Sequence, residues 1–166
     1  MDWYPLYNSL RIALISTAII FFAGIAAAYY VARLPRALTG VLDVLFTLPL
    51  VLPPTVVGYL LLRVLGPKRT VGAWVLAHFN LKLTMVWWSA IFATAVVIFP
   101  LMYRTARGAF ESFDETLADA GRTLGRSNTW IFWRVRMPCC RQGILAGTVL
   151  AFARALGEYG ATSMVA

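Results

Sequence analysis

Two oppositely charged residues, Arg154 and Glu158, lie inside an otherwise apolar stretch that runs from about Gly143 to Ala166. If this stretch is a membrane helix, Arg154 is about 16 Å deep, where a charge costs roughly 2.5–3.5 kcal/mol. Glu158 follows one helical turn later, so the two side chains can pair on the same face. We interpret the pair as part of a translocation pathway; a structural ion pair between helices is the alternative.

Residue types that carry out catalysis are few. His78 is the one histidine, and Cys139 and Cys140 are adjacent, a spacing that fits neither a disulfide framework nor a C-x-x-C metal or redox site. The chain has no G-x-x-x-x-G-K-[ST] loop, which a P-loop phosphate site needs. Four acids recur at helical spacing in one polar segment, as on a solvated helix face: Glu111, Asp114, Glu115 and Asp119. We predict no catalytic residue, no metal site and no cofactor in this chain.

The composition predicts a membrane protein. Of the 166 residues, 60% are apolar and only 13% are charged, whereas globular chains carry roughly 25% charged residues. Too few polar side chains exist to cover a surface in water. The net charge of +8 does not indicate nucleic acid, because the basic residues fall mostly between apolar runs, as in loops that face a membrane surface.

Four apolar stretches are long enough to cross roughly 30 Å of hydrocarbon as helices. They cover about residues 9–32, 41–65, 85–103 and 143–166, within one transmembrane domain of residues 1–166. The first stretch is longer than the core of a signal peptide, so we expect it to be retained. A shorter apolar piece at 71–81 is expected to lie at the membrane interface.

The basic residues predict the orientation of these helices. The loop at 33–40 holds two arginines and the loop at 104–142 holds seven, and both loops lie on the same side of the membrane if the spans alternate. The opposite side holds five basic residues: Arg11, Arg63, Lys68, Arg69 and Lys82. Because basic loops stay in the cytoplasm, we expect both arginine-rich loops there and the N-terminus outside.

Three prolines interrupt the second apolar stretch and break its helix, because proline lacks the backbone donor. Irregular backbone at membrane depth persists only against protein or a water-filled cavity, so the break is expected to line the pathway, with a packing kink as the alternative. Gly58, Gly157 and Gly160 are expected to allow close approach of helices. The pathway candidates are Pro49, Pro53, Pro54, Thr55, Gly58, Arg154 and Glu158.

The polar segment 104–142 predicts two helices outside the membrane. Apolar residues recur at helical spacing in its first half: Phe110, Phe113, Leu117, Ala120 and Leu124. Gly125 ends this helix, and a second short helix over 129–136 carries three aromatic side chains before Pro138 stops it. Two such helices predict a docking surface for a soluble partner, and packing against the protein's own helices is an equal alternative.

The same segment resembles the EAA loop of ABC-importer permeases, which reads Glu-Ala-Ala, three residues, Gly, and a Phe/Val/Leu-Pro ending. Asp119 replaces the Glu and keeps its charge. Gly121 replaces the second Ala and lowers helix propensity by about 1 kcal/mol, and Gln142 stands where a further Pro is usual. The resemblance assigns partner coupling to Asp119, Ala120, Gly121, Gly125, Phe132, Val135 and Pro138.

Two further segments narrow the resemblance. The stretch 152–162 is similar to one shared by molybdate and sulfate permeases, and the stretch 48–59 is closer to the molybdate branch. The resemblance implies an all-α bundle of the type I importer kind in a bacterial inner membrane. It also implies a second copy of the subunit, two ABC ATPase subunits that hold ATP and Mg, and an external binding protein. The implied cargo is molybdate or tungstate, with sulfate or thiosulfate as the alternative.

Two other classes remain open from the residues alone. A four-span membrane enzyme needs clustered His, Cys or carboxylate side chains near one membrane face, and a scaffold protein needs none. Co-purification with an ATPase subunit separates the permease from both. Members of the family usually continue through at least one more span, so we expect this chain to be truncated at its C-terminus.

Overall fold

The described residues of the computed structural model, 4–65 and 87–165, form helices joined by short connections. The helices are α1 (Tyr4–Val31), α2 (Arg36–Val51), α3 (Pro54–Leu65), α5 (Trp87–Glu111), α6 (Glu115–Thr123), α7 (Asn128–Ile131), the π-helical turn η1 (Phe132–Arg136) and α8 (Met137–Val165). No strand occurs within these ranges, and the predicted all-α fold is confirmed. The predicted interfacial piece at 71–81 and His78 lie outside the described residues, as do the side chains from Glu158 onward.

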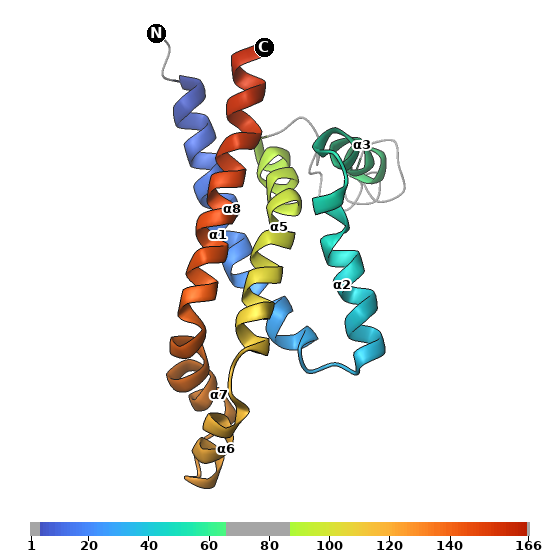
Figure 1. Ribbon diagram of the computed structural model, residues 1–166. Coiled ribbons are helices and arrows are strands. Elements are labelled where there is room, and N and C mark those ends of the chain that lie inside the picture. Colours follow the sequence, from blue (N-terminus) through green and yellow to red (C-terminus); the bar gives the residue numbers. More distant parts are fainter. Residues whose placement is uncertain (1–3, 66–86, 166) are drawn as a thin grey trace, which may run out of the picture.

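The body of the molecule is a bundle of three long helices, α1, α5 and α8, as Figure 1 shows. Its core includes Ile12, Ile98, Met102 and Tyr103, whose side chains are almost fully buried. The hydroxyl of Ser16 donates to the backbone oxygen of Ile91 at 3.1 Å and so joins α1 to α5 through a satisfied polar contact. Packing of apolar side chains therefore holds the three helices together, and the hydrogen bond of Ser16 adds a polar link between α1 and α5.

Glycines bring α8 and α5 close together. A Cβ atom added at Gly147 would lie 1.9 Å from Oγ1 of Thr105, and one added at Gly143 would lie 2.6 Å from Cβ of Ala109. The two glycines form a G-x-x-x-G pair on one helix face, which is the pattern of closely packed membrane helices.

The glycines singled out from the sequence behave differently. A Cβ at Gly58 or Gly157 meets no described atom within 4 Å, so among the described residues neither glycine lies at a close approach of helices. Gly157 is exposed and Gly58 is half-buried, and composition alone does not tell which face of a helix turns inward. Gly160 lies beyond the described side chains.

Two described helices are long and apolar enough to cross a membrane, Leu6–Val31 and Trp88–Glu111. A third candidate is the pair Arg36–Val51 and Pro54–Val64, which is bent by 113°. In the described residues α8 is not among these candidates, so the four-span organisation stays a prediction. The helix of the third predicted stretch also continues past Tyr103 to Glu111, so the first part of segment 104–142 belongs to α5.

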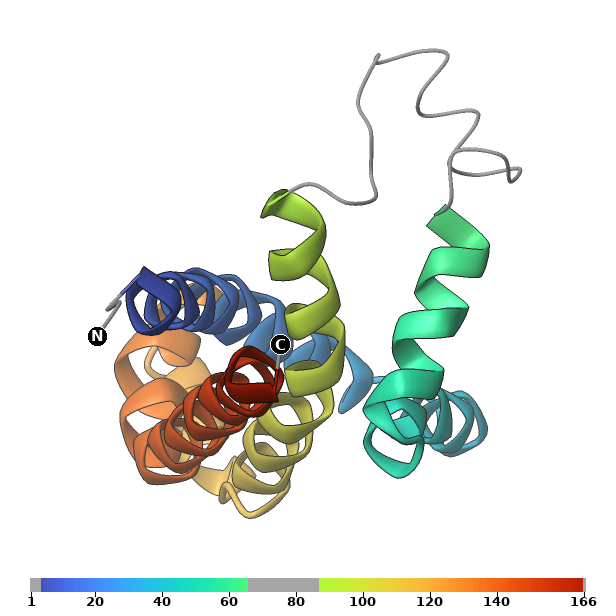
Figure 2. The same ribbon diagram turned by 90° about the horizontal axis from the view of Figure 1, so that it is seen from above.

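The break in the second apolar stretch lies at Leu52 and Pro53. Pro49 is inside α2, and Pro54 begins α3. Leu52 has extended backbone angles (φ −76°, ψ 142°), the conformation that a following proline favours. We refer to α2 and α3 together as the arm; both views show α5 standing between the arm and α8 (Figures 1 and 2).

The connections gather at two ends of the molecule. Figure 1 shows α6, α7 and the connection between α1 and α2 toward one end, and α3 and both chain termini toward the other. The two arginine-rich loops recognised in the sequence therefore lie toward the same end.

Candidate partner-docking site

Asp114 caps the N-terminus of the short helix α6, which begins at Glu115. Its side chain accepts a hydrogen bond of 3.0 Å from the backbone N–H of Thr116, which satisfies one of the open donors of the first turn. Hydrogen bonds from the backbone and the hydroxyl of Thr116 hold the pKa of the Asp114 carboxyl below its usual value. Phe113, immediately before the cap, is buried and anchors the turn between α5 and α6.

Gly125 ends α6 in a left-handed conformation with φ +73°. The N–H of Gly125 donates to the oxygen of Arg122 at 2.9 Å, and the N–H of Arg126 donates to the oxygen of Gly121 at 3.1 Å. This pair of bonds is a Schellman motif, which only a residue tolerant of positive φ completes without strain. Ser127 then caps α7 by accepting from the N–H of Trp130 at 3.3 Å.

The chain continues helically from α7 through η1 into α8, so the prediction that Pro138 stops the second helix is wrong. The N–H of Met137 donates to the oxygen of Phe132, five residues earlier, which defines a π-helical turn. In an α-helix the ring of Pro138 would clash with the carbonyl of Arg134 and leave it without a donor. The wider turn directly before the proline gives room for that ring, and the helix survives.

The inner face of α6 is made of small residues. Ala118 and Gly121 are buried, and a Cβ at Gly121 would lie 3.0 Å from Cγ1 of Ile131 on α7. Gly121 stands where the EAA pattern has its second alanine, and at this position α6 and α7 approach each other closely.

The apolar stripe predicted from the sequence is split by the break between α5 and α6. Its first members, Phe110 and Phe113, are buried, whereas Leu117 is 47% and Leu124 79% exposed. The helix ends at Glu111 and restarts at Glu115, and this break changes the rotational phase of the residues that follow.

An ion pair between Arg136 and Glu115 fixes α6 against the turn that leads into α8. Nη2 of Arg136 donates to Oε1 of Glu115 at 2.6 Å. Arg136 is 8% exposed, and its guanidinium lies 4.6 Å from the ring centroid of Phe113. Sequence reasoning missed this pair, because the two residues are separated by the whole of α6 and α7.

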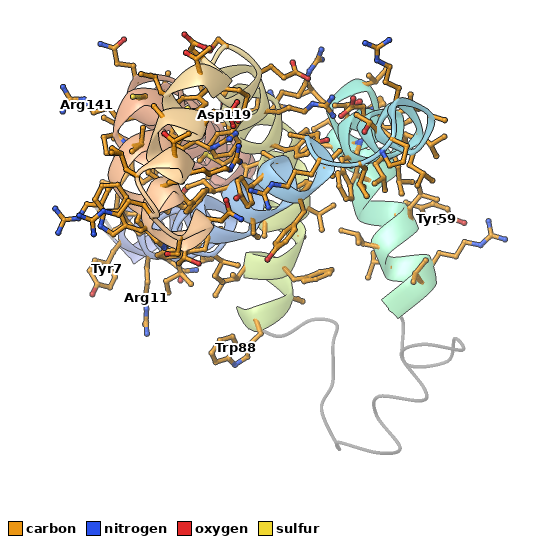
Figure 3. All side chains as sticks on the ribbon, turned by 90° about the horizontal axis from the view of Figure 1, so that it is seen from below. Tyr7, Arg11, Tyr59, Trp88, Asp119 and Arg141 are labelled. Carbon is orange, nitrogen blue, oxygen red and sulfur yellow. The ribbon has the colours of Figure 1, made fainter. Side chains whose placement is uncertain are left out.

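We define the docking face as the five exposed apolar residues of α6, α7 and η1: Leu117, Ala120, Leu124, Trp130 and Trp133. Asp119 lies beside them and pairs with Arg122, whose Nε also donates to Oδ1 of Asn128 at 3.2 Å. Figure 3 views the molecule from this end, with Asp119 on α6 and Tyr59 far from it on the arm.

The structure places the seven predicted coupling residues in three environments. Asp119, Ala120, Gly125 and Pro138 are exposed, and Gly121 is buried against α7. Phe132 and Val135 are half-buried. Phe132 turns inward, with its ring centroid 4.5 Å from that of Tyr29 on α1.

The predicted pathway residues fall into two groups that one chain does not bring together. Pro53, Pro54 and Thr55 are exposed on the arm, and Pro49 and Gly58 are half-buried there. Arg154 is exposed on α8, and the side chain of Glu158 lies outside the described residues, so their pairing stays a prediction. α5 separates the two groups (Figures 1 and 2).

A polar cluster that the sequence analysis did not single out connects the arm to α5. The phenol of Tyr103 donates to Oδ1 of Asp43 at 2.5 Å, and Arg107 forms an ion pair with the same carboxylate. Nη2 of Arg107 lies 2.9 Å from Oε1 of Glu111. Asp43 carried a usable signal, because it is the one acid within the apolar stretch 41–65.

Comparison with known proteins decides the family. The family described as "Binding-protein-dependent transport system inner membrane component" matches residues 19–166. The chain belongs to this family. It is therefore a multi-pass membrane protein of the permease class, and the resemblance recognised in the sequence is confirmed.

Several relatives of this family are similar to the chain over most of its length. The "Molybdenum transport system permease protein ModB" of Escherichia coli (strain K12) is 40% identical over 161 residues, which are 97% of this chain and 70% of the relative. The protein of the same name from Haemophilus influenzae is 44% identical over 75% of this chain and 53% of the relative. The one from Azotobacter vinelandii is 32% identical over 95% and 70%. All three are named as transport permeases, in agreement with a transport subunit rather than an enzyme.

Proposed function

We propose that this chain is the membrane-spanning permease subunit of an ATP-driven importer that carries molybdate across the inner membrane. The observation that carries the proposal is the docking face, on which large apolar side chains such as Leu124 and Trp133 stand exposed at one end of the bundle. Helix caps, a Schellman turn and a buried arginine hold the face rigid. Exposed apolar clusters of this kind mark interaction sites. The names of the relatives supply the cargo.

The proposed assembly contains two copies of this permease, two ABC ATPase subunits and an external binding protein. Each ATPase subunit docks on one docking face and binds ATP and Mg. The docking face is cytoplasmic and the N-terminus external. The excess of arginine in the two loops at one end of the molecule supports this orientation.

Transport in this proposal is alternating access. ATP closes the two ATPase subunits and displaces the docking face. Because Glu115 and Arg136 tie α6 to η1, and η1 is continuous with α8, the displacement reaches the membrane helices as a rigid movement. The broken backbone at Pro53 and the charged residue Arg154 are the proposed pathway elements that open in turn to each side.

Sulfate or thiosulfate is the alternative cargo, since these oxyanions resemble molybdate in shape and charge. The stretch 152–162 is similar in molybdate and sulfate permeases and does not separate them. The decisive measurement is ATP hydrolysis by the reconstituted complex with its binding protein, in the presence of molybdate, tungstate or sulfate. We expect molybdate to stimulate ATP hydrolysis. Stimulation by sulfate alone would identify sulfate, and not molybdate, as the cargo.

A second experiment tests the docking face itself. Replacing Leu124, 79% exposed, by glutamine removes an apolar contact without disturbing the core, and we expect the permease to lose co-purification with its ATPase subunit. Leu34→Gln is the matched control, because Leu34 is also exposed but lies in the connection between α1 and α2. Equal recovery of the ATPase with both variants would reject the docking face, and a scaffold without an ATPase partner would then be the better reading.

A further inference from the structure

The arm is attached to the rest of the chain by little apolar packing. No residue of α2 is buried, and Val57 is the one buried residue among the described positions of α3. Both helices pack against α5. From α2, Leu42 and Phe46 pack against the core, and the ring centroid of Phe46 lies 5.3 Å from that of Phe99 and 5.1 Å from that of Tyr103. An element with so few buried apolar contacts changes position easily unless another interaction fixes it.

The polar cluster beside this aromatic contact supplies the fixing interaction. Tyr103 and Arg107 lie one helical turn apart on α5, and both donate to the single oxygen Oδ1 of Asp43. Nη1 of Arg107 also donates to the phenolic oxygen of Tyr103 at 3.1 Å, so the three groups form a closed triangle. The side chain of Arg107 is only 13% exposed, and a guanidinium so far removed from water requires its acidic partners.

Arg107 reaches in the other direction as well. Its Nε and Nη2 atoms donate to Oε1 of Glu111 at 3.0 and 2.9 Å. Glu111 is the last residue of α5, and α6 begins four residues later at Glu115. One planar guanidinium therefore joins the arm to the part of α5 that carries α6, and the fork geometry of arginine allows both contacts at once.

We propose that Asp43, Tyr103 and Arg107 form the joint that transmits movement of α6 to the arm. This inference rests on the proposed function and deepens it. Asp43 and Arg107 are positioning residues: they do not touch the anion, and they set where the proline break of the arm stands relative to the bundle. A purely structural ion pair makes a different prediction, since its loss lowers stability and assembly without separating ATP hydrolysis from transport.

The test compares ATP hydrolysis with molybdate uptake in the same proteoliposomes of the complete complex. Asp43→Ala removes the shared acceptor, and Arg107→Lys keeps the charge but cannot hold both acids. Glu111 still pairs with Arg107 in Asp43→Ala. For both variants we therefore expect the assembled complex to hydrolyse ATP near the wild-type rate, while uptake per ATP hydrolysed falls about tenfold. Arg104→Gln is the control, because Arg104 is an exposed cation of the same helix with no ion pair among the described residues. An unchanged uptake per ATP in either assembled variant overturns the proposal, whether both rates stay at the wild-type level or both fall in parallel.

A milder variant guards against misfolding. Tyr103→Phe removes only the phenolic hydroxyl, which donates to Asp43 and accepts from Arg107, and keeps the aromatic packing on Phe46 and Phe99. We expect an intermediate loss of uptake per ATP, and an unchanged ratio counts against the joint.

A readout that does not depend on the cargo separates this inference from the proposed function. Spin labels at Tyr59 on the arm and Arg141 on α8, both exposed (Figure 3), report the position of the arm in a background of Cys139→Ser and Cys140→Ala. We expect an ATP analogue to shift the separation of the labels in the otherwise unaltered complex and to leave it unshifted with Asp43→Ala. Absence of molybdate uptake by the wild type would reject molybdate as the cargo and would leave the proposed joint untouched. A shift of equal size in Asp43→Ala would reject the joint.

Discussion

The Nη2 atom of Arg136 lies 2.6 Å from the Oε1 atom of Glu115, and this contact ties the turn before α8 to the first turn of α6. The two partners differ in environment: the side chain of Arg136 is 9% exposed and that of Glu115 is 55% exposed. The arginine is therefore the partner that depends on the pair, because water cannot replace the lost carboxylate around it.

Removal of the Glu115 carboxylate is expected to destabilise the protein. Glu115→Ala leaves a nearly buried guanidinium without its acceptor, and we expect a loss of about 1–2 kcal/mol, less than for a fully buried pair because Glu115 faces solvent. Asp119→Ala is the control. It breaks the exposed pair with Arg122 and is expected to cost no more than about 0.5 kcal/mol. Thermal unfolding in detergent measures the stability of both variants. Equal unfolding midpoints would contradict the inference that Arg136 depends on its pair with Glu115.

The cap of α6 is expected to weaken in acid. The pKa of Asp114 is lowered in the folded protein by hydrogen bonds from Thr116, so the cap is fully effective above the pKa of the unfolded carboxyl. It is lost as the pH falls through the lower folded pKa, that is, below about pH 4.

Hydrogen exchange of the first-turn amides of α6, corrected for intrinsic rates, follows this loss. Asp114→Asn is the control, because asparagine is an equally good cap whose side chain does not titrate in this range. Protection that falls with pH in the wild type but stays constant in the variant is the expected result. The same acid dependence in both proteins would assign the effect to other carboxyl groups.

The contact between Gly147 and Thr105 is expected to set the spacing of α8 and α5. Gly147→Ala introduces a Cβ at 1.9 Å from Oγ1 of Thr105, and overpacking of this kind costs typically 1–3 kcal/mol. Gly157→Ala on the same helix enters open space and is expected to be neutral or slightly stabilising, because alanine favours helix.

A compensating substitution tests the geometry directly. Thr105→Ala removes the oxygen at the point of collision, although its Cβ, 3.0 Å away, remains. We expect the double variant Gly147→Ala, Thr105→Ala to lose less stability than the sum of the two single variants. Simple additivity of the unfolding free energies would show that the two residues are not in contact.

Much of the fold was predictable because it depends on patterns of composition. The apolar stretches, the proline break after Leu52 and the turn at Gly125 all follow from properties of single residues and their immediate neighbours. The EAA-like spacing identified the family, which the comparisons confirm.

What the sequence could not supply was the direction in which side chains face. The stripe from Phe110 to Leu124 reads as one helix, and only the break at Ser112 shows that its two halves face different ways. Pro138 was expected to stop a helix, whereas the π-helical turn before it allows the helix to continue. The partners of Asp43 and Arg136 come from distant segments, so no local pattern indicates them.

The native cysteines report the orientation of the chain without any engineered site. Cys139 is exposed at the start of α8, near the docking face, whereas Cys140 is 4% exposed and its Sγ donates to the backbone oxygen of Ala109 at 3.2 Å. Thiol reagents attack accessible thiolates, so Cys139 is expected to react and Cys140 to remain protected until the protein unfolds. Cys139→Ser is expected to abolish labelling, and Cys140→Ser to leave it unchanged.

A membrane-impermeant maleimide applied to the two faces of the membrane then tests the proposed orientation. If the docking face is cytoplasmic, Cys139 reacts in inside-out vesicles and stays unlabelled in intact cells, with detergent-solubilised membranes giving the total that can react. Labelling of Cys139 from outside intact cells would place α6 on the external side. No cytoplasmic ATPase could then reach Leu124 and its neighbours, and the proposed coupling of ATP hydrolysis to transport would have to be abandoned.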